Sequence, residues 1–258
     1  MSPFLELRGL TRWFGGLLAV QDVSLGVERG QVVGLIGPNG AGKTTLFNLV
    51  SGVLRPHRGD VFFEGRRLTG APMHEIARHG LVRTFQLSRL WGNFTVLQNV
   101  LVGCHLHAGV RVWQTILDPG GSRATEQRLE VRAREILHLV GLAGREDEIA
   151  ASLPHGLQRV LQIAIALAPE PKVLLLDEPV TGMNHVEVDA VMGLIRRLCD
   201  ERGVTAVLVE HNMKAVMGVC DRLAVLHFGR KIAEGTPDEI ARNEEVVQAY
   251  LGVYDATA

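Results

Sequence analysis

Short apolar segments of strand length recur along the chain, separated by turn residues or by amphipathic helical patterns. In the first third, the predicted strands are residues 4–7, 19–27, 31–36, 61–64 and 81–85, and helices are predicted near 46–50 and 72–77. From residue 172 onward strands and helices alternate, with strands at 172–176, 204–209 and 222–227 and helices at 186–201 and 213–219. Repeated strand–helix–strand units favour a parallel sheet with helices on both faces. The pattern therefore predicts an α/β fold.

The middle of the chain has a different pattern. Apolar residues recur at helical spacing in residues 96–102 and again in 129–140, and few β-branched runs occur in this part. A loop is predicted around Asp118-Pro119-Gly120-Gly121. We interpret residues 87–152 as a helical insert. The elements predicted after it are a helix at 156–168, a hairpin formed by residues 223–227 and 231–234, and a helical tail at 237–252.

The composition fits a folded protein, and the length allows one large α/β domain or two small ones. Of its 258 residues 47% are hydrophobic, and a formal net charge of −1 gives no basic excess that would point to nucleic acid. Cys104, Cys199 and Cys220 lack metal-like spacing, which favours free thiols in a reducing compartment. The N-terminus lacks the pattern of a signal peptide, and no apolar run approaches the roughly 18 residues of a membrane span. Any membrane role is expected to come through a partner.

The predicted strand at residues 31–36 leads directly into a glycine-rich segment, which we call the phosphate loop. It consists of Gly37, Pro38, Asn39, Gly40, Ala41, Gly42, Lys43, Thr44 and Thr45. Strand, loop and helix together match the pattern G-x-x-x-x-G-K-[ST] in the context that binds nucleotide phosphates. The glycines let successive N–H groups point at phosphate oxygens, and the helix adds the positive end of its dipole. We expect Lys43 to contact the β- and γ-phosphates of a nucleotide, and the Thr44 hydroxyl to hold Mg²⁺.

Polar residues also follow the other predicted parallel strands. Ligands bind at the carboxyl ends of the strands in an open parallel sheet, so Gly37, Gln86, Asp177, Glu178 and His211 are expected to converge on one crevice. Asp177 is predicted to hold Mg²⁺ through water, and Glu178 to polarise the attacking water. Gln86 offers an amide oxygen to Mg²⁺ or to that water, although a surface glutamine explains it equally well. Only its place at a strand end separates His211 from a structural histidine.

Taken together, these segments resemble the ATP-binding subunit of an ABC transporter over essentially the whole chain. The matching segments are residues 37–45, Thr84-Phe85-Gln86, Leu153–Arg159, Leu174–Pro179, Thr181–Asn184 and Val209-Glu210-His211. The resemblance implies a single ABC ATPase domain, residues 1–258, with a RecA-like P-loop NTPase core that has a parallel sheet. It also implies an N-terminal antiparallel β subdomain and an inserted α-helical subdomain. The implied boundaries are 1–86 and 153–235 for the core, 87–152 for the helical subdomain and 236–258 for a C-terminal tail.

The resemblance also implies roles and partners. Phe14 matches the aromatic residue that stacks on adenine, and Glu178, His211 and Gln86 match the catalytic residues, with Thr44, Gln86 and Asp177 at the metal. Two such subunits pack head to tail, and each encloses ATP between its own phosphate loop and the partner's signature helix. The implied partners are two transmembrane permease subunits, a second ATP-binding subunit and, indirectly, a substrate-binding protein, with no nucleic acid. The implied location is the cytoplasmic face of the cell membrane, as a peripheral protein.

One segment departs from the family pattern. The family signature reads Leu-Ser-Gly-Gly-Gln, whereas the signature segment here, Leu153–Arg159, begins Leu-Pro-His-Gly-Leu. Pro154 stands where a serine would donate a hydrogen bond to the γ-phosphate, and His155 and Gly156 complete the contact. Proline still starts a helix well and Gly156 still allows close approach. We expect the contact to survive with one hydrogen bond fewer. Ile165 also stands where relatives usually carry arginine, which together with Pro154 puts the rate of hydrolysis in question.

The cargo can be predicted only from the resemblance. The starting segment Phe14-Gly-Gly-Leu-Leu-Ala-Val20, the segment Gly182-Met183-Asn184 and the C-terminal segment are similar to importers of branched-chain amino acids. Importers of urea and other small polar solutes share much of this pattern. An ABC-type ATPase of a lipid or polysaccharide exporter is the alternative.

Two other classes of function stay open on the residues alone. ABC-type ATPases that act on DNA or ribosomes carry long coiled-coil insertions or two cassettes, whereas a single cassette without heptads spans residues 37–178 here. A small-molecule kinase or GTPase would share only the phosphate loop. Glu178 directly after Asp177, together with His211 at a strand end, disfavours that second class.

Overall fold

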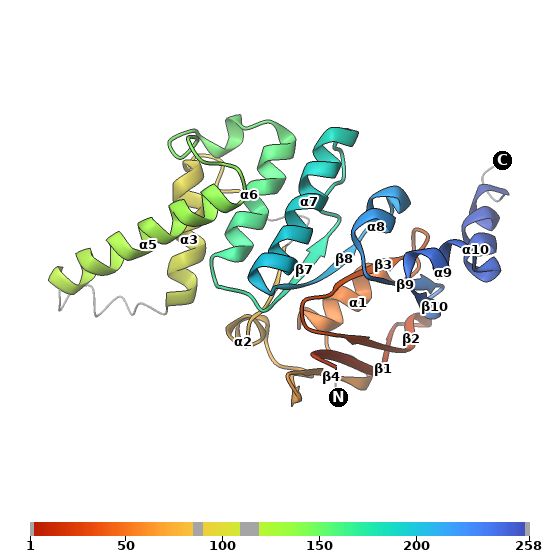
Figure 1. Cartoon of the computed structure of the whole chain (residues 1–258). Coiled ribbons are helices and arrows are strands. Elements are labelled where there is room, and N and C mark those ends of the chain that lie inside the picture. Colours follow the sequence, from red (N-terminus) through yellow and green to blue (C-terminus); the bar gives the residue numbers. More distant parts are fainter. Residues whose placement is uncertain (1–2, 85–89, 109–118, 256–258) are drawn as a thin grey trace.

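Two β-sheets form the centre of the protein in the computed structural model, which describes residues 3–84, 90–108 and 119–255 (Figure 1). The first sheet is antiparallel, with the order β2-β1-β4-β5: β1 Leu5–Phe14, β2 Leu17–Val27, β4 Arg58–Phe63 and β5 Arg66–Arg67. The second sheet has the order β10-β9-β3-β8-β7-β6: β3 Val32–Ile36, β6 Leu81–Arg83, β7 Val173–Asp177, β8 Thr205–Val209, β9 Arg222–His227 and β10 Arg230–Gly235. All of its pairings are parallel except β9 with β10. The predicted α/β fold, parallel sheet and hairpin are confirmed.

The helices cover both faces of the second sheet. They are α1 Lys43–Val50, α2 Met73–Arg78, α3 Val96–Ala108, α5 Pro119–Leu139, α6 His155–Leu167, α7 His185–Arg202, α8 Met213–Val219, α9 Pro237–Ala241 and α10 Glu244–Asp255. Figure 1 shows α1 between the two sheets, with α7 and α8 on the opposite face of the second sheet and α3 and α5 beyond one end. In the described residues, no helix is both long and apolar enough to cross a membrane.

Both faces of the parallel sheet are buried, which explains the nearly continuous apolar runs of its strands. Successive side chains of a strand point to opposite faces. In β3, Val33 and Leu35 pack with α1 and the antiparallel sheet, while Val32 and Ile36 pack with the helices on the other side. Strands β7 and β8 alternate in the same way. Because β3 is packed on both faces, its carboxyl end is held in place, and the first turn of α1 follows it in the chain.

Most predicted elements differ from the structure by a few residues at their ends, the tail predicted at 237–252 is divided into α9 and α10, and two further elements differ more. The first strand was expected at residues 4–7, but β1 continues to Phe14 because register shifts and the positive φ of Gly9, 58°, let its pairing with β2 resume. The loop predicted around Pro119 is wrong for the described residues, because α5 begins there; Asp118 lies outside them. A proline is tolerated at the first position of a helix, where its missing N–H has no intrahelical partner.

The helices between β6 and β7 pack on one another. Helix α3 lies against α5 and α6. Val100, Leu137 and Leu161 of these helices belong to the same buried cluster as the face of the parallel sheet opposite α1. The subdomain boundaries at residues 86, 152 and 235 stay predictions.

Candidate nucleotide-binding site

The carboxyl ends of four neighbouring parallel strands meet at one edge of the second sheet. Their order is β3-β8-β7-β6. The register pairs Leu35 and Asp177 with Val209, and Arg83 with Leu175, so the strands end at nearly the same level. Gly37, Asp177, Glu178 and His211 therefore lie at one edge, as the sequence predicts. Gln86 lies outside the described residues, so its predicted role at the metal and the attacking water stays a prediction.

The phosphate loop requires glycine at specific positions. The φ angles of Gly37, Gly40 and Gly42 are 149°, 79° and 99°, a region that residues with a Cβ rarely adopt. A Cβ on Gly37 would lie 2.1 Å from the Leu226 oxygen, and one on Gly42 would lie 2.4 Å from the Ala19 oxygen. A Cβ on Gly40 would meet nothing within 4 Å. The loop is thus packed closely at both ends and open in its middle.

Lys43 bends back over this loop. Its side chain is buried, and its Nζ donates hydrogen bonds to the carbonyl oxygens of Gly37, at 2.6 Å, and Pro38, at 2.9 Å. Burial lowers the pKa of the Lys43 ammonium, and the negative charge of Glu178 opposes that shift. The loop carbonyls therefore hold the ammonium at the loop. Thr44, at the next position of α1, is exposed.

Asp177 ends strand β7 in a buried environment. Its Oδ2 accepts a 2.7 Å hydrogen bond from Arg83 of β6, and the exposed fractions of the two side chains are 2% and 6%. Its other oxygen, Oδ1, is buried and has no hydrogen-bond partner in the part of the chain that the structure describes. Sequence reasoning missed Arg83. The signal available was a single cation inside an apolar predicted strand, which needs a partner when it is buried.

Glu178 and His211 lie close to each other. His211 Nδ1 is 3.9 Å from Glu178 Oε1 and 4.0 Å from an oxygen of Glu210. Glu178 has a positive φ of 48°, and its Oε2 accepts a hydrogen bond from the Thr181 hydroxyl. Buried Glu210 accepts hydrogen bonds from the N–H groups of Val180, at 3.1 Å, and His211, at 3.2 Å. The Glu210 carboxylate thus ties together the segments that carry Glu178 and His211.

Burial raises the pKa of Glu210, while the backbone N–H groups that it accepts from lower it. Sequence reasoning counted Glu210 only as part of the segment before His211.

The aromatic residue assigned to the adenine base lies beside the loop. Phe14 is the last residue of β1, is 43% exposed, and pairs in register with Leu17. The Arg12 guanidinium lies 4.9 Å from the centroid of its ring. Ala19 of the following strand touches Gly42, as described above, so this hairpin borders the phosphate loop. Stacking of Phe14 on adenine stays a prediction.

The signature segment begins helix α6. Pro154 is the N-cap and makes no side-chain hydrogen bond there, and both Pro154 and His155 are exposed. Gly156 is buried, and a Cβ on it would lie 2.7 Å from the Glu187 carboxylate. A larger residue at position 156 would therefore have to displace the Glu187 side chain.

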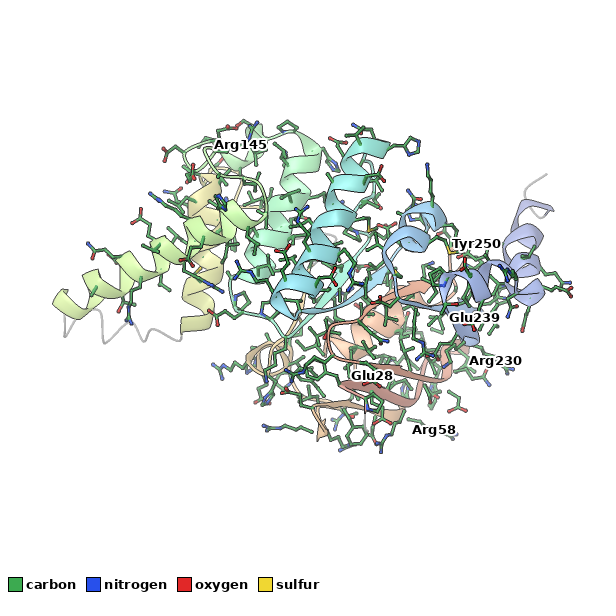
Figure 2. The ribbon with its side chains drawn as sticks, viewed as in Figure 1. Glu28, Arg58, Arg145, Arg230, Glu239 and Tyr250 are labelled. Carbon is green, nitrogen blue, oxygen red and sulfur yellow. The ribbon has the colours of Figure 1, made fainter. Side chains whose placement is uncertain are left out.

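Tyr250 reaches the phosphate loop from the C-terminal helix α10, and Figure 2 shows its place on that helix. Burial raises the pKa of Tyr250 to about 12, and the Gly37 backbone opposes that shift. Its hydroxyl oxygen is buried, and no group in the described residues meets it in hydrogen-bond geometry. Sequence reasoning did not connect this tyrosine with the loop.

The donor set suits a hard cation that a nucleotide shares. Mg²⁺ is bound through one or two carboxylates or hydroxyls, waters and substrate phosphates. The buried Oδ1 atom of Asp177, which lacks a protein partner in the described residues, and the exposed Thr44 hydroxyl on α1 provide such ligands. The residues present therefore fit Mg²⁺.

A parallel sheet with a glycine-rich loop before α1 and acidic residues at the neighbouring strand ends defines a P-loop nucleotide-binding ATPase. Residues 20–181 match the ABC transporter family model, and residues 230–256 match the model of the branched-chain amino acid ATP-binding cassette transporter. The chain belongs to the ABC transporter family and is an ATP-hydrolysing cassette of it. The resemblance in the sequence is confirmed.

Relatives of known description cover nearly the whole chain. The high-affinity branched-chain amino acid transport ATP-binding protein BraF of Pseudomonas aeruginosa is 43% identical over 250 residues, covering 97% of this chain and 98% of BraF. LivG of Salmonella typhimurium, with the same description, is 43% identical over 252 residues, with the same coverage. The ADP conformation of an ATP-binding cassette of an ABC transporter superposes with a TM-score of 0.86 and 30% identity, covering 98% of this chain and 100% of that one.

Proposed function

We propose that the chain powers an ABC importer for branched-chain amino acids or a similar small polar solute. The observation that supports this cargo most directly is the C-terminal match, because residues 230–256 fit a model specific to branched-chain amino acid cassettes. This region contains β10, α9 and α10, and its Tyr250 reaches the phosphate loop. The match to BraF over nearly the whole chain points in the same direction.

In the proposed mechanism, the phosphate loop binds the β- and γ-phosphates of ATP. The Lys43 ammonium exchanges its two loop carbonyls for phosphate oxygens, which are stronger acceptors because they carry charge. Mg²⁺, when bound, neutralises part of the phosphate charge. Thr44 and Asp177 hold the metal, with Gln86 as a further ligand, and Phe14 stacks on the adenine.

Hydrolysis in this mechanism needs an oriented water molecule. Glu178 accepts a proton from that water, and His211, 3.9 Å from Glu178, holds the far end of the γ-phosphate. The hydrogen bonds of Glu210 to Val180 and His211 keep both segments in register. Catalysis then consists of positioning and neutralising charge.

The site also requires a second subunit. The N-terminus of α6, with exposed Pro154 and His155 and with Gly156 behind them, closes the nucleotide site of a second ATP-binding subunit, and that subunit's signature helix closes this one. Two permease subunits form the membrane part, and a substrate-binding protein delivers the solute. The chain then lies peripherally at the cytoplasmic face of the cell membrane.

Reconstitution tests the cargo. The chain is purified with the membrane subunits that copurify with it, inserted into proteoliposomes with ATP inside, and given labelled leucine with its binding protein outside. We expect ATP-dependent accumulation of leucine, and none with Glu178→Gln in the same complex. ATP-dependent movement of lipid or polysaccharide, without leucine uptake, would overturn the proposal in favour of the exporter.

A further inference from the structure

Arg83 connects two parts of the nucleotide site that are distant in sequence. Its Nη2 donates to Asp177 Oδ2 at 2.7 Å, and its Nη1 donates to Asn48 Oδ1 at 2.7 Å and to Ser51 Oγ at 3.0 Å. Asn48 lies in α1, the helix that begins in the phosphate loop, and Ser51 is the C-cap of that helix. One guanidinium therefore links the acidic end of β7 to the helix after the loop.

The surroundings of this guanidinium fix its direction. It is almost fully buried, and its central carbon lies 5.6 Å from the centroid of the Phe47 ring. An arginine presents its N–H groups in a rigid planar fork, so several acceptors together determine its orientation. The acceptors on α1 thus aim the Nη2 group at Asp177.

The two carboxylate oxygens of Asp177 have different surroundings. Oδ2 is occupied by Arg83, whereas Oδ1 is buried and has no hydrogen-bond partner in the described residues. A buried acceptor without a partner is rare and unfavourable unless a ligand or water completes it. The pair therefore presents one carboxylate oxygen in a defined direction.

We propose that Arg83 is a positioning residue for Mg²⁺ binding: it holds Asp177 Oδ2 so that Oδ1 faces the metal or its bound water, and it ties this carboxylate to α1. The inference rests on the proposed function only through the assignment of Asp177 to the metal. Hydrogen-bond partners of metal-ligating groups contribute to metal affinity because they fix the ligand's orientation. Arg83 acts on the metal through its contact with Asp177.

The test measures Mg²⁺-dependent tightening of nucleotide binding in the purified full chain. A fluorescent ATP analogue is titrated with Mg²⁺, and separately in EDTA, for the wild type and for Arg83→Lys. Lysine keeps the charge but lacks the fork. We expect the half-saturating Mg²⁺ concentration to rise roughly tenfold or more, with unchanged nucleotide affinity in EDTA.

The matched control is Arg67→Lys, because the Arg67–Asp60 pair has the same 2.7 Å distance but is exposed. It should leave the Mg²⁺ requirement unchanged. If Arg83→Lys fails to fold, Ser51→Ala and Asn48→Ala keep the Arg83–Asp177 contact and loosen its aim, and they should raise the requirement in the same direction. A wild-type requirement in the folded Arg83→Lys variant, or in both of these alanine variants, would overturn the proposal.

A double-mutant cycle separates this inference from the metal assignment. Asp177→Asn should raise the Mg²⁺ requirement, and adding Arg83→Lys to it should have no further effect, since Arg83 acts through Asp177. An undiminished further effect would show that Arg83 acts independently of Asp177 and would overturn the proposal. If Asp177→Asn itself leaves the requirement unchanged, the metal assignment within the proposed function fails first.

Discussion

The phosphate loop and the signature segment differ in how far the chain itself fixes their geometry. In the phosphate loop, Lys43 and two glycines are held by hydrogen bonds and close contacts within the chain. In the signature segment, Leu153 and Gly156 are buried, but Pro154 and His155 between them are exposed, and Pro154 makes no side-chain cap hydrogen bond. The difference agrees with the proposed function, in which this chain holds ATP with its own phosphate loop and presents Pro154 and His155 to a second subunit.

The largest effect is expected from Lys43→Ala in the phosphate loop. Hydrogen bonds to charged groups contribute about 1.5–3 kcal/mol each, so losing the ammonium should weaken ATP binding by roughly 100-fold or more. Fluorescent nucleotide binding by the purified chain measures this. Lys172→Ala is the control, because Lys172 is about half exposed and pairs with Glu64 away from the loop. Equal affinities of Lys43→Ala and the wild type would contradict the assignment.

Next comes a pair of glycine variants. Gly42→Ala brings a Cβ to 2.4 Å from a backbone oxygen, whereas Gly40→Ala meets nothing within 4 Å, although both positions have positive φ. A Cβ at positive φ alone costs about 1–2 kcal/mol. We expect Gly42→Ala to lower the free energy of unfolding by at least about 1 kcal/mol more than Gly40→Ala does. Urea denaturation measures both, and equal losses would show that the loop is not closely packed at Gly42.

Pro154→Ser tests the signature segment. Serine restores a donor at the exposed N-cap of α6, where the structure has none. One recovered hydrogen bond to a charged phosphate corresponds to about 1.5–3 kcal/mol, so ATP hydrolysis by the complete transporter should become roughly tenfold faster. The stability of the isolated chain should change little. Unchanged ATPase and transport in the assembled complex would reject a weakened signature contact.

The smallest effect is expected at Tyr250. Its buried hydroxyl has no hydrogen-bond partner in the described residues, so Tyr250→Phe removes a buried polar atom without breaking a bond. The free energy of unfolding should rise or stay the same, within about 1 kcal/mol. Thermal unfolding without nucleotide measures the change. A clear loss of stability would mean that the hydroxyl is bonded to the Gly37 segment in solution.

Local sequence patterns predicted well the part of the site that holds the phosphates and the metal. The phosphate loop, the acidic end of β7 and the end of β8 follow from strand runs and turn residues that are neighbours in sequence, and parallel pairing brings them together. Arg83 was missed because its partner Asp177 is 94 residues away, and nothing near position 83 reveals that β6 pairs with β7. Tyr250 was missed because Gly37, the residue of the phosphate loop near it, is also far away in sequence. The extent of β1 was missed because register shifts interrupt its alternation.

The altered signature was visible in the sequence, but its consequence depends on a second subunit. Pro154 and His155 stand at the predicted helix start, and the structure shows them exposed there. Their role in another subunit's site cannot be derived from contacts within one chain. This explains why the sequence predicts the ATP-holding half in detail and the complementary half only through family resemblance.

In the proposed function, residues at this chain's own strand ends hydrolyse the ATP held by its phosphate loop. Glu178→Gln in the complex with its membrane subunits tests it most directly, by comparing ATP binding with the rate of phosphate release. We expect binding to persist while hydrolysis falls at least about 100-fold, since general base catalysis contributes that much. Hydrolysis at the wild-type rate by the Glu178→Gln complex would contradict it.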